Sequence, residues 1–178
     1  SRSNPRTFTN ELREMTGSSD VLVTAHCGAG AKKLREAVEE LKAACEREPH
    51  LPPPILIVMY MGNDLFTNKS ALLSDIPGEV TREVTALAAL TRHFPISAAV
   101  VGGYSQKWGA PVLFDVHMAQ LRSLFSAAGV LHVDGTPEFM GLEMYDQWHF
   151  RKSEETGKVV ARLTLGLAEL APVVSPPL

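Results

Sequence analysis

An aspartate and a histidine near the carboxyl end of the chain have the residue types and the spacing of a catalytic pair. They enclose the polar loop Asp146-Gln147-Trp148-His149, which runs into an amphipathic C-terminal stretch. In a turn, the carboxylate can reach Nδ1 of the ring, fix the tautomer and leave Nε2 free to accept a proton. The pair therefore predicts a general base for nucleophilic catalysis, with a simple helix-capping loop as the alternative.

A second candidate is the turn Gly62-Asn63-Asp64, which follows the apolar run Ile55–Met61. Glycine lets a substrate approach the backbone closely, and the Asn63 amide is a neutral donor that needs no deprotonation. Such a turn can stabilise the oxyanion that develops in acyl transfer. The same residues also suit an ordinary turn, because Gly and Asn tolerate positive φ and Asp caps helices.

A glycine-rich turn earlier in the chain offers the same chemistry. The segment Cys27-Gly28-Ala29-Gly30 follows the β-branched run Asp20–Thr24, and a free amide N–H there can also serve an oxyanion. The alternative is that the two glycines let a helix pack close to the sheet. Cys27 beside His26 is a further candidate nucleophile, although close packing explains a small residue there equally well.

Alternating strands and helices must position these turns. Short β-branched or apolar runs predict strands at Asp20–Thr24, Ile55–Met61, Ser97–Val101 and Val130–Val133. Apolar residues at helical spacing predict helices over 5–17, 31–48, after Pro77, over 111–129 and from 153 to about 170. The inward-facing residues of the last three helices are predicted to be Val80, Val84, Leu87 and Thr91, then Phe114, Met118, Leu121 and Phe125, then Val160, Leu163, Leu167 and Leu170.

This alternation predicts an α/β fold with a parallel sheet that helices cover on both faces. Ligands bind at the carboxyl ends of the strands in such sheets. Those ends carry Gly28–Gly30, Gly62–Asp64 and Gly102–Tyr104, and further on the chain Asp146 and His149. We therefore expect an acyl-transfer site at this end of the sheet.

Length and composition narrow the possible functions. The 178 residues, 45% hydrophobic and 21% charged, predict a single domain spanning 1–178. A net charge of −3 without a basic cluster argues against nucleic acid as a partner. The longest apolar run is far shorter than the roughly 20 residues of a membrane span. The histidines lack metal-ligand spacing, and Gly28-x-Gly30 lacks the third glycine of a dinucleotide fingerprint, so no metal or organic cofactor is implied.

With these motifs the chain resembles the SGNH (GDSL-type) hydrolase superfamily, over almost its whole length. The segment Cys27–Leu34, C-G-A-G-A-K-K-L, is similar to the family's second block. Met61–Asp64 supplies the G-N-D of its third block, and Asp146 with His149 supplies the D-x-x-H of its fifth. The resemblance implies a flavodoxin-like, three-layer α/β/α sandwich. It also implies that Gly28 and Asn63 hold the oxyanion while Asp146 orients His149.

The chain departs from the family in the first block, the G-D-S that ends strand one and carries the nucleophilic serine. No G-D-S occurs in the sequence, which begins about where that strand would end. The sheet thus lacks its first strand. Either residues upstream of Ser1 or a partner chain would complete the sheet, or the protein has rebuilt it. In the first case Ser1 lies where the nucleophile is expected, with Ser3 as a weaker candidate.

The resemblance implies a serine ester hydrolase that works through an acyl-enzyme. Its substrate would be a small-molecule or carbohydrate ester. The alternative is a catalytically inactive domain of the same fold that serves as a binding or structural subunit, because the serine block is absent. A nucleotide-binding domain of flavodoxin-like fold is a third hypothesis, although the sequence contains no phosphate-binding loop.

Overall fold

The structure is a computed structural model. It describes residues 5–18, 20–23, 29–66, 75–102, 107, 109–110, 112–146, 149–151 and 153–170, with the backbone alone at 5–8 and 153.

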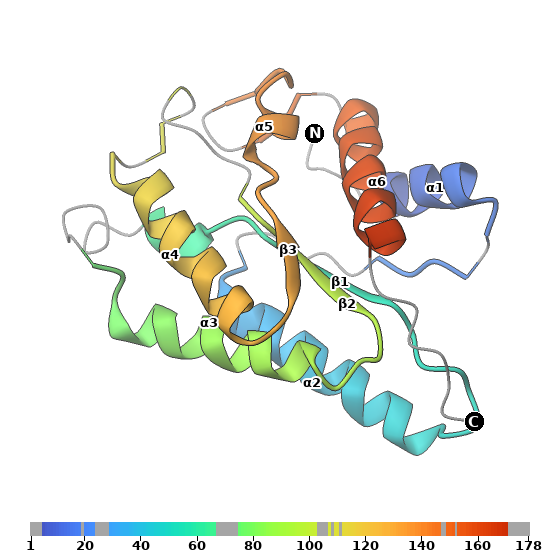
Figure 1. The fold of residues 1–178 in the computed structure, drawn as a ribbon. Helices are drawn as coiled ribbons and strands as arrows, with labels where there is room; N and C mark the ends of the chain where they lie inside the picture. Colours follow the sequence, from blue (N-terminus) through green and yellow to red (C-terminus); the bar gives the residue numbers. More distant parts are fainter. Residues whose placement is uncertain are drawn as a thin grey trace.

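A parallel sheet of three strands forms the centre of the described chain (Figure 1). The strands are β1 (Leu56–Tyr60), β2 (Ser97–Val101) and β3 (Leu131–Val133), in the spatial order β1-β2-β3. In the register, Ala99 pairs with Val58 on one side and with His132 on the other. The predicted α/β class with a parallel sheet is therefore confirmed.

Helices cover both faces of this sheet (Figure 1). On one face lie α2 (Ala31–Arg47), α3 (Gly78–Thr91) and α4 (Phe114–Ala127). On the other face α6 (Ser153–Leu170) packs against β2 and β3, and α1 (Pro5–Thr16) packs against α6. Two short helical turns complete the described elements, the 3-10 helix η1 (Asn63–Phe66) and the helix α5 (Thr136–Phe139).

Strand β2 shows why the runs in the sequence are apolar without a break. Ala99 and Val101 join the core beneath α2, α3 and α4, whereas Ala98 and Val100 join the core beneath α6. All four side chains are at most 1% exposed. A strand buried on both faces has no polar face, so its sequence cannot alternate.

The predicted stripes of α3 and α4 are buried in full, each residue at most 7% exposed. In α6, Val160 and Leu167 are buried and Leu163 packs against both clusters on that face. The prediction that Leu170 faces inward is wrong, because this last residue of α6 is 67% exposed. The helix predicted from Pro111 begins at Phe114 in the structure, and Pro111 lies outside the described residues.

The strand predicted at Asp20–Thr24 is also wrong over its described part, because residues 20–23 belong to no strand. The β-branched run has the composition of a strand, but a strand also needs a neighbouring ladder, which the described sheet does not provide here. Instead, the Arg13 guanidinium donates to the Val21 carbonyl at 3.2 Å, and Leu22 is 84% exposed. Thr24 lies outside the described residues.

Strand β1 is an edge of the described sheet. Its Leu56 N–H donates to Ile96, and its Tyr60 carbonyl accepts from Gly102, so alternate residues of β1 face β2. The backbone groups of Ile57 and Met59 consequently point the other way. Within the described part of the chain, no further strand pairs with them.

None of the helices in the described ranges is long and apolar enough to cross a lipid bilayer.

The packing of α4 gives a direct test of the core. Leu121→Ala removes a side chain that is fully buried between α4 and the sheet, and we expect a loss of about 2–5 kcal/mol in the free energy of unfolding, measured by urea titration. The control is Val116→Ala on the same helix, 51% exposed, for which a change within about 0.5 kcal/mol is expected. Equal losses in the two variants would contradict the orientation of α4.

Candidate active site

Asp146 and His149 form the contact that their spacing predicts. The Nδ1 of His149 lies 2.8 Å from Oδ2 and 3.0 Å from Oδ1 of Asp146, and the backbone N–H of His149 donates to Oδ1 at 2.8 Å. A carboxylate at Nδ1 favours the tautomer that carries its proton there, which leaves the Nε2 lone pair free. The side chains are 47% and 43% exposed, so a substrate has access to the ring.

A short hairpin holds this pair. The Tyr145 N–H donates to the His149 carbonyl at 2.6 Å, and the Arg151 N–H donates to the Glu143 carbonyl at 2.7 Å. Met144 and Phe150 form an isolated antiparallel bridge between these two bonds. The backbone of the turn is thus fixed on both sides of Asp146, and the carboxylate reaches the ring without a long loop.

Packing on the α6 side anchors the hairpin. Phe150 stacks on Phe139 of α5 with ring centroids 5.4 Å apart, and both belong to a cluster with Val159 and Val160 of α6. Met144 packs against this cluster and also against the core on the opposite face. No helix was predicted between β3 and α6, although Thr136-Pro137-Glu138, which begins α5, is a recognisable helix start.

The Gly62-Asn63 turn has a conformation that requires glycine. Gly62 has φ +73°, and a Cβ built there would lie 2.6 Å from the Met118 sulfur and 3.1 Å from the Phe114 ring. Asn63 follows at the start of η1 with an ordinary φ, and its Nδ2 donates to the Ala29 carbonyl at 2.9 Å. The amide has two N–H groups, so one remains to meet a ligand.

Asp64 is a functional candidate for which the sequence predicted only a place in a turn or a role as a helix cap. Its Oδ2 accepts from the Ala31 N–H at 2.8 Å, at the start of α2, and from the Tyr60 hydroxyl at 2.6 Å. Gly30, the N-cap of α2, makes no side-chain cap bond, so the Asp64 carboxylate takes that place from a distant part of the chain. Tyr60 lies only four residues before Asp64, at the end of β1, but no local pattern in the sequence pairs the two side chains.

The phenol of Tyr60 is a permanent donor in this arrangement. Its side chain is fully buried, and burial, together with the negative charge of Asp64 and the hydrogen bond to it, raises the pKa of Tyr60 well above its ordinary value. The hydroxyl therefore stays protonated throughout the pH range in which proteins are ordinarily studied.

A second set of polar contacts joins the ends of β2 and β3. Arg122 of α4 donates to the Val101 carbonyl and pairs with Asp134 at 3.3 Å, while Asp134 also accepts from the Thr136 N–H at 2.9 Å. Gly102, with φ +145°, lies against Asp134 and Thr136 with no room for a Cβ. Gly103 and Tyr104, predicted at the same strand end, lie outside the described residues.

The structure thus joins Asp146 to His149, and Asn63 to Ala29, the residue after Gly28. Gly28 itself and Ser1 lie outside the described residues, as do Ser3, His26, Cys27 and Trp148.

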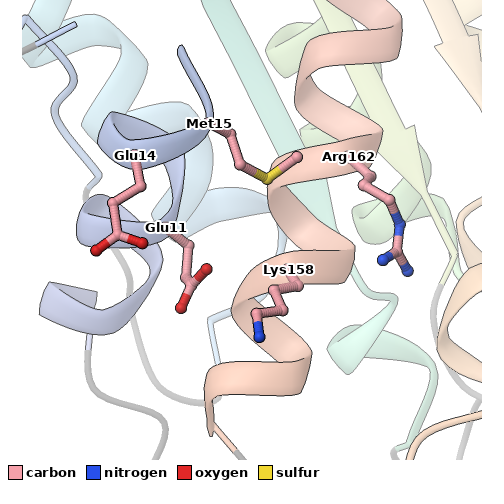
Figure 2. Close-up of a pocket in the computed structure, with 5 residues that line it drawn as sticks. All are labelled: Glu11, Glu14, Met15, Lys158 and Arg162. Carbon is pink, nitrogen blue, oxygen red and sulfur yellow. The ribbon is translucent and has the colours of Figure 1, made fainter. Parts of the chain in front are cut away.

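A groove of about 360 Å³ lies elsewhere, between α1 and α6 (Figure 2). Glu11, Glu14 and Met15 line its α1 side, and Lys158 and Arg162 line its α6 side. The Lys158 ammonium forms an ion pair with Glu154 at 2.8 Å, and this contact raises the pKa of Lys158. Among the described candidates, Asn63, Asp146 and His149 are not part of its lining.

The described residues include no group of three or more His, Cys, Asp or Glu side chains placed to hold a metal ion. Comparisons of the chain with protein-family models, with curated proteins and with solved structures found no match.

The left-handed turn at Gly62 can be tested against a matched glycine. Gly62→Ala should lose the cost of a left-handed alanine, about 1–2 kcal/mol, and a further 1–3 kcal/mol from crowding against Met118 and Phe114. Gly129 has the same φ of +73° but nothing within 4 Å of a built Cβ, so Gly129→Ala should lose only the first contribution. Unfolding titrations of both variants would reveal the difference, and equal losses would contradict the packing at Gly62.

Proposed function

We propose that the protein is a serine ester hydrolase of the SGNH type that works through an acyl-enzyme. The observation that carries the proposal is the contact between Asp146 and His149, in which both carboxylate oxygens lie within 3.0 Å of Nδ1. A solvent-accessible histidine held in this way is equipped as a general base, because its Nε2 is free and the carboxylate stabilises the imidazolium.

The reaction divides into two half-reactions, in each of which Nε2 of His149 accepts one proton and then donates one. In acylation a serine Oγ attacks the ester carbonyl carbon, its proton moves to Nε2, and the C–O bond of the ester breaks as Nε2 protonates the leaving alkoxide. In deacylation a water oxygen attacks the acyl carbon and its proton moves to Nε2; the bond between the acyl carbon and Oγ then breaks as Nε2 protonates Oγ, which releases the carboxylic acid. Asp146 stays ionised throughout and balances the charge of the imidazolium.

Asn63 and Gly28 are the proposed oxyanion donors. One N–H of the Asn63 amide is bound to the Ala29 carbonyl, and the other would donate to the negative oxygen of the tetrahedral intermediate. The backbone N–H of Gly28 would be the second donor. Ser1 is the candidate nucleophile carried forward from the sequence, ahead of Ser3.

The substrate class is the one that the resemblance implies, and the open position of the pair is compatible with it. Asp146 and His149 are each nearly half exposed, and the reaction needs neither a metal nor an organic cofactor. We propose a small-molecule or carbohydrate ester, in an α/β/α sandwich whose sheet includes one more strand beside β1.

The second candidate function is a binding or structural subunit of the same fold without activity. Two observations favour it: the sequence contains no G-D-S, and β1 has no strand partner on its outer side among the described residues. In this case a partner chain would complete the sheet and no serine would be activated.

Substitution of the base separates the two functions. His149→Ala should lower kcat for p-nitrophenyl acetate by roughly 10²–10⁴-fold, because general acid–base catalysis contributes that much. Asp146→Asn should lower kcat by a comparable factor through the wrong tautomer. His50→Ala is the control, since this histidine is 72% exposed and contacts only the exposed Glu48; its kcat should not change. No hydrolysis by the unaltered protein, or full activity in His149→Ala, would exclude the hydrolase.

The nucleophile is identified by a covalent label. A fluorophosphonate should modify one serine in the unaltered protein and react far more slowly with His149→Ala, because the base activates the attacking hydroxyl. Peptide mass spectrometry locates the modified residue, and Ser1→Ala should abolish the labelling. A label on another serine would transfer the role to that residue, and no label at all would favour the inactive subunit.

A further inference from the structure

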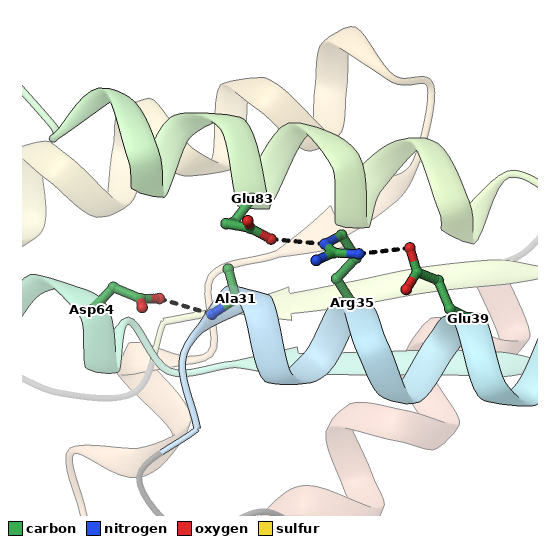
Figure 3. A network of polar contacts seen from close by, with 5 residues as sticks. All are labelled: Ala31, Arg35, Glu39, Asp64 and Glu83. Carbon is green, nitrogen blue, oxygen red and sulfur yellow. Dashed lines mark hydrogen bonds and ion pairs between the residues drawn. The ribbon is translucent and has the colours of Figure 1, made fainter.

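Asp64 joins three separate segments of the chain at the edge of the proposed site. It follows Asn63 in η1, accepts a hydrogen bond from the last residue of β1, Tyr60, and accepts another from Ala31 at the start of α2. Figure 3 shows the Asp64 carboxylate directed at the first residue of that helix.

Asn63 and Asp64 form hydrogen bonds to opposite ends of the same turn, residues 29–31. The Asn63 amide donates to the Ala29 carbonyl, and the Asp64 carboxylate accepts from the Ala31 N–H. Gly30 lies between these two bonds, and a Cβ added there would come within 1.9 Å of Oδ1 of Asp64. The carboxylate therefore lies directly against the backbone of the turn, and the turn cannot shift without moving Asp64.

We infer that Asp64, held by the Tyr60 hydroxyl, is a positioning residue that sets the orientation of the Asn63 amide by clamping the turn 29–31. The inference rests on the proposed function for its catalytic consequence. The Ala29 carbonyl fixes one N–H of Asn63, and the planarity of the amide then fixes the direction of the other. If the turn is released, the carbonyl moves and the second N–H loses its direction. Asp64 itself acts only through Asn63 and the turn.

A purely structural role predicts a different outcome. If Asp64 merely caps α2, its loss would reduce stability while the folded protein kept the same Asn63 amide and the same kcat. The two roles are therefore distinguished by the state of that amide and by the split between kcat and KM, measured on folded protein.

The test compares Asp64→Ala with Asp64→Asn. In Asp64→Ala we expect the side-chain N–H resonances of Asn63 in ¹H–¹⁵N spectra to broaden or merge toward those of a free amide, and kcat to fall about 10–100-fold with KM within about twofold, as for a misaligned oxyanion donor. Asp64→Asn keeps an oxygen that can accept from Ala31 and Tyr60, so it should recover most of both readouts. Tyr60→Phe keeps the ring and removes only the donor, and it should give an intermediate effect.

The control substitution weakens a polar contact made one turn further along α2, where the helix is paired with α3 (Figure 3). Arg35 of α2 pairs with Glu83 of α3 at 2.7 Å. Glu83→Gln therefore weakens a polar contact of α2 without touching the turn 29–31, and it should leave the Asn63 resonances and kcat unchanged.

The outcomes separate the inference from the proposed function. Unchanged Asn63 resonances in both Asp64→Ala and Tyr60→Phe would overturn the inference, as would unchanged kcat in an active protein. If the unaltered protein hydrolyses no ester, the proposed function fails by itself, and the Asn63 resonances still decide whether Asp64 sets that amide. If Asp64→Ala does not fold, Tyr60→Phe and Asp64→Asn provide the same comparison.

Discussion

The contact between the Asp146 carboxylate and the His149 imidazole is the interaction on which the functional account depends. Its three bonds engage one backbone N–H and one ring nitrogen, so the carboxylate fixes both the turn and the ring. The pair is exposed and therefore accessible, but exposure also means that solvent weakens the attraction between the two groups. The hairpin and the stacking of Phe150 on Phe139 must therefore hold the geometry, because a surface ion pair alone would not.

Close packing also fixes the backbone at three glycines, two of them after strands and one before α2. Gly62 lies against Met118, Gly30 against Asp64, and Gly102 against Asp134. In each case a polar or apolar side chain occupies the space that a Cβ would fill. At these glycines the backbone therefore lies close to a neighbouring side chain, an approach that a residue with a Cβ would prevent.

Much of the fold was predictable because its signals are local. The stripe Phe114, Met118, Leu121 and Phe125 and the apolar run Ser97–Val101 each identify one element, and each is buried as expected. The errors arise where tertiary context decides. Residues 20–23 have strand composition but no neighbouring ladder in the described sheet. Leu170 continues the helical period of apolar residues, yet at the last position of α6 it is exposed.

For the site, D-x-x-H spacing was sufficient to predict the contact between Asp146 and His149, since both partners lie in one turn. The bond from Asp64 to Ala31 joins residues 33 positions apart, and no local pattern specifies such a pair. The role of Tyr60 depends on its burial beside Asp64, which follows only from the packing of α2 against β1.

The central claim is that the free Nε2 of His149 and the free N–H of Asn63 act at the same reacting ester group. A crystal structure of the protein after reaction with a fluorophosphonate tests it most directly. The account predicts a phosphonyl oxygen about 2.7–3.1 Å from Nδ2 of Asn63 and a phosphonylated serine oxygen within hydrogen-bond distance of Nε2 of His149. An adduct far from either residue, or His149 on the opposite side of the sheet from Asn63, would contradict it.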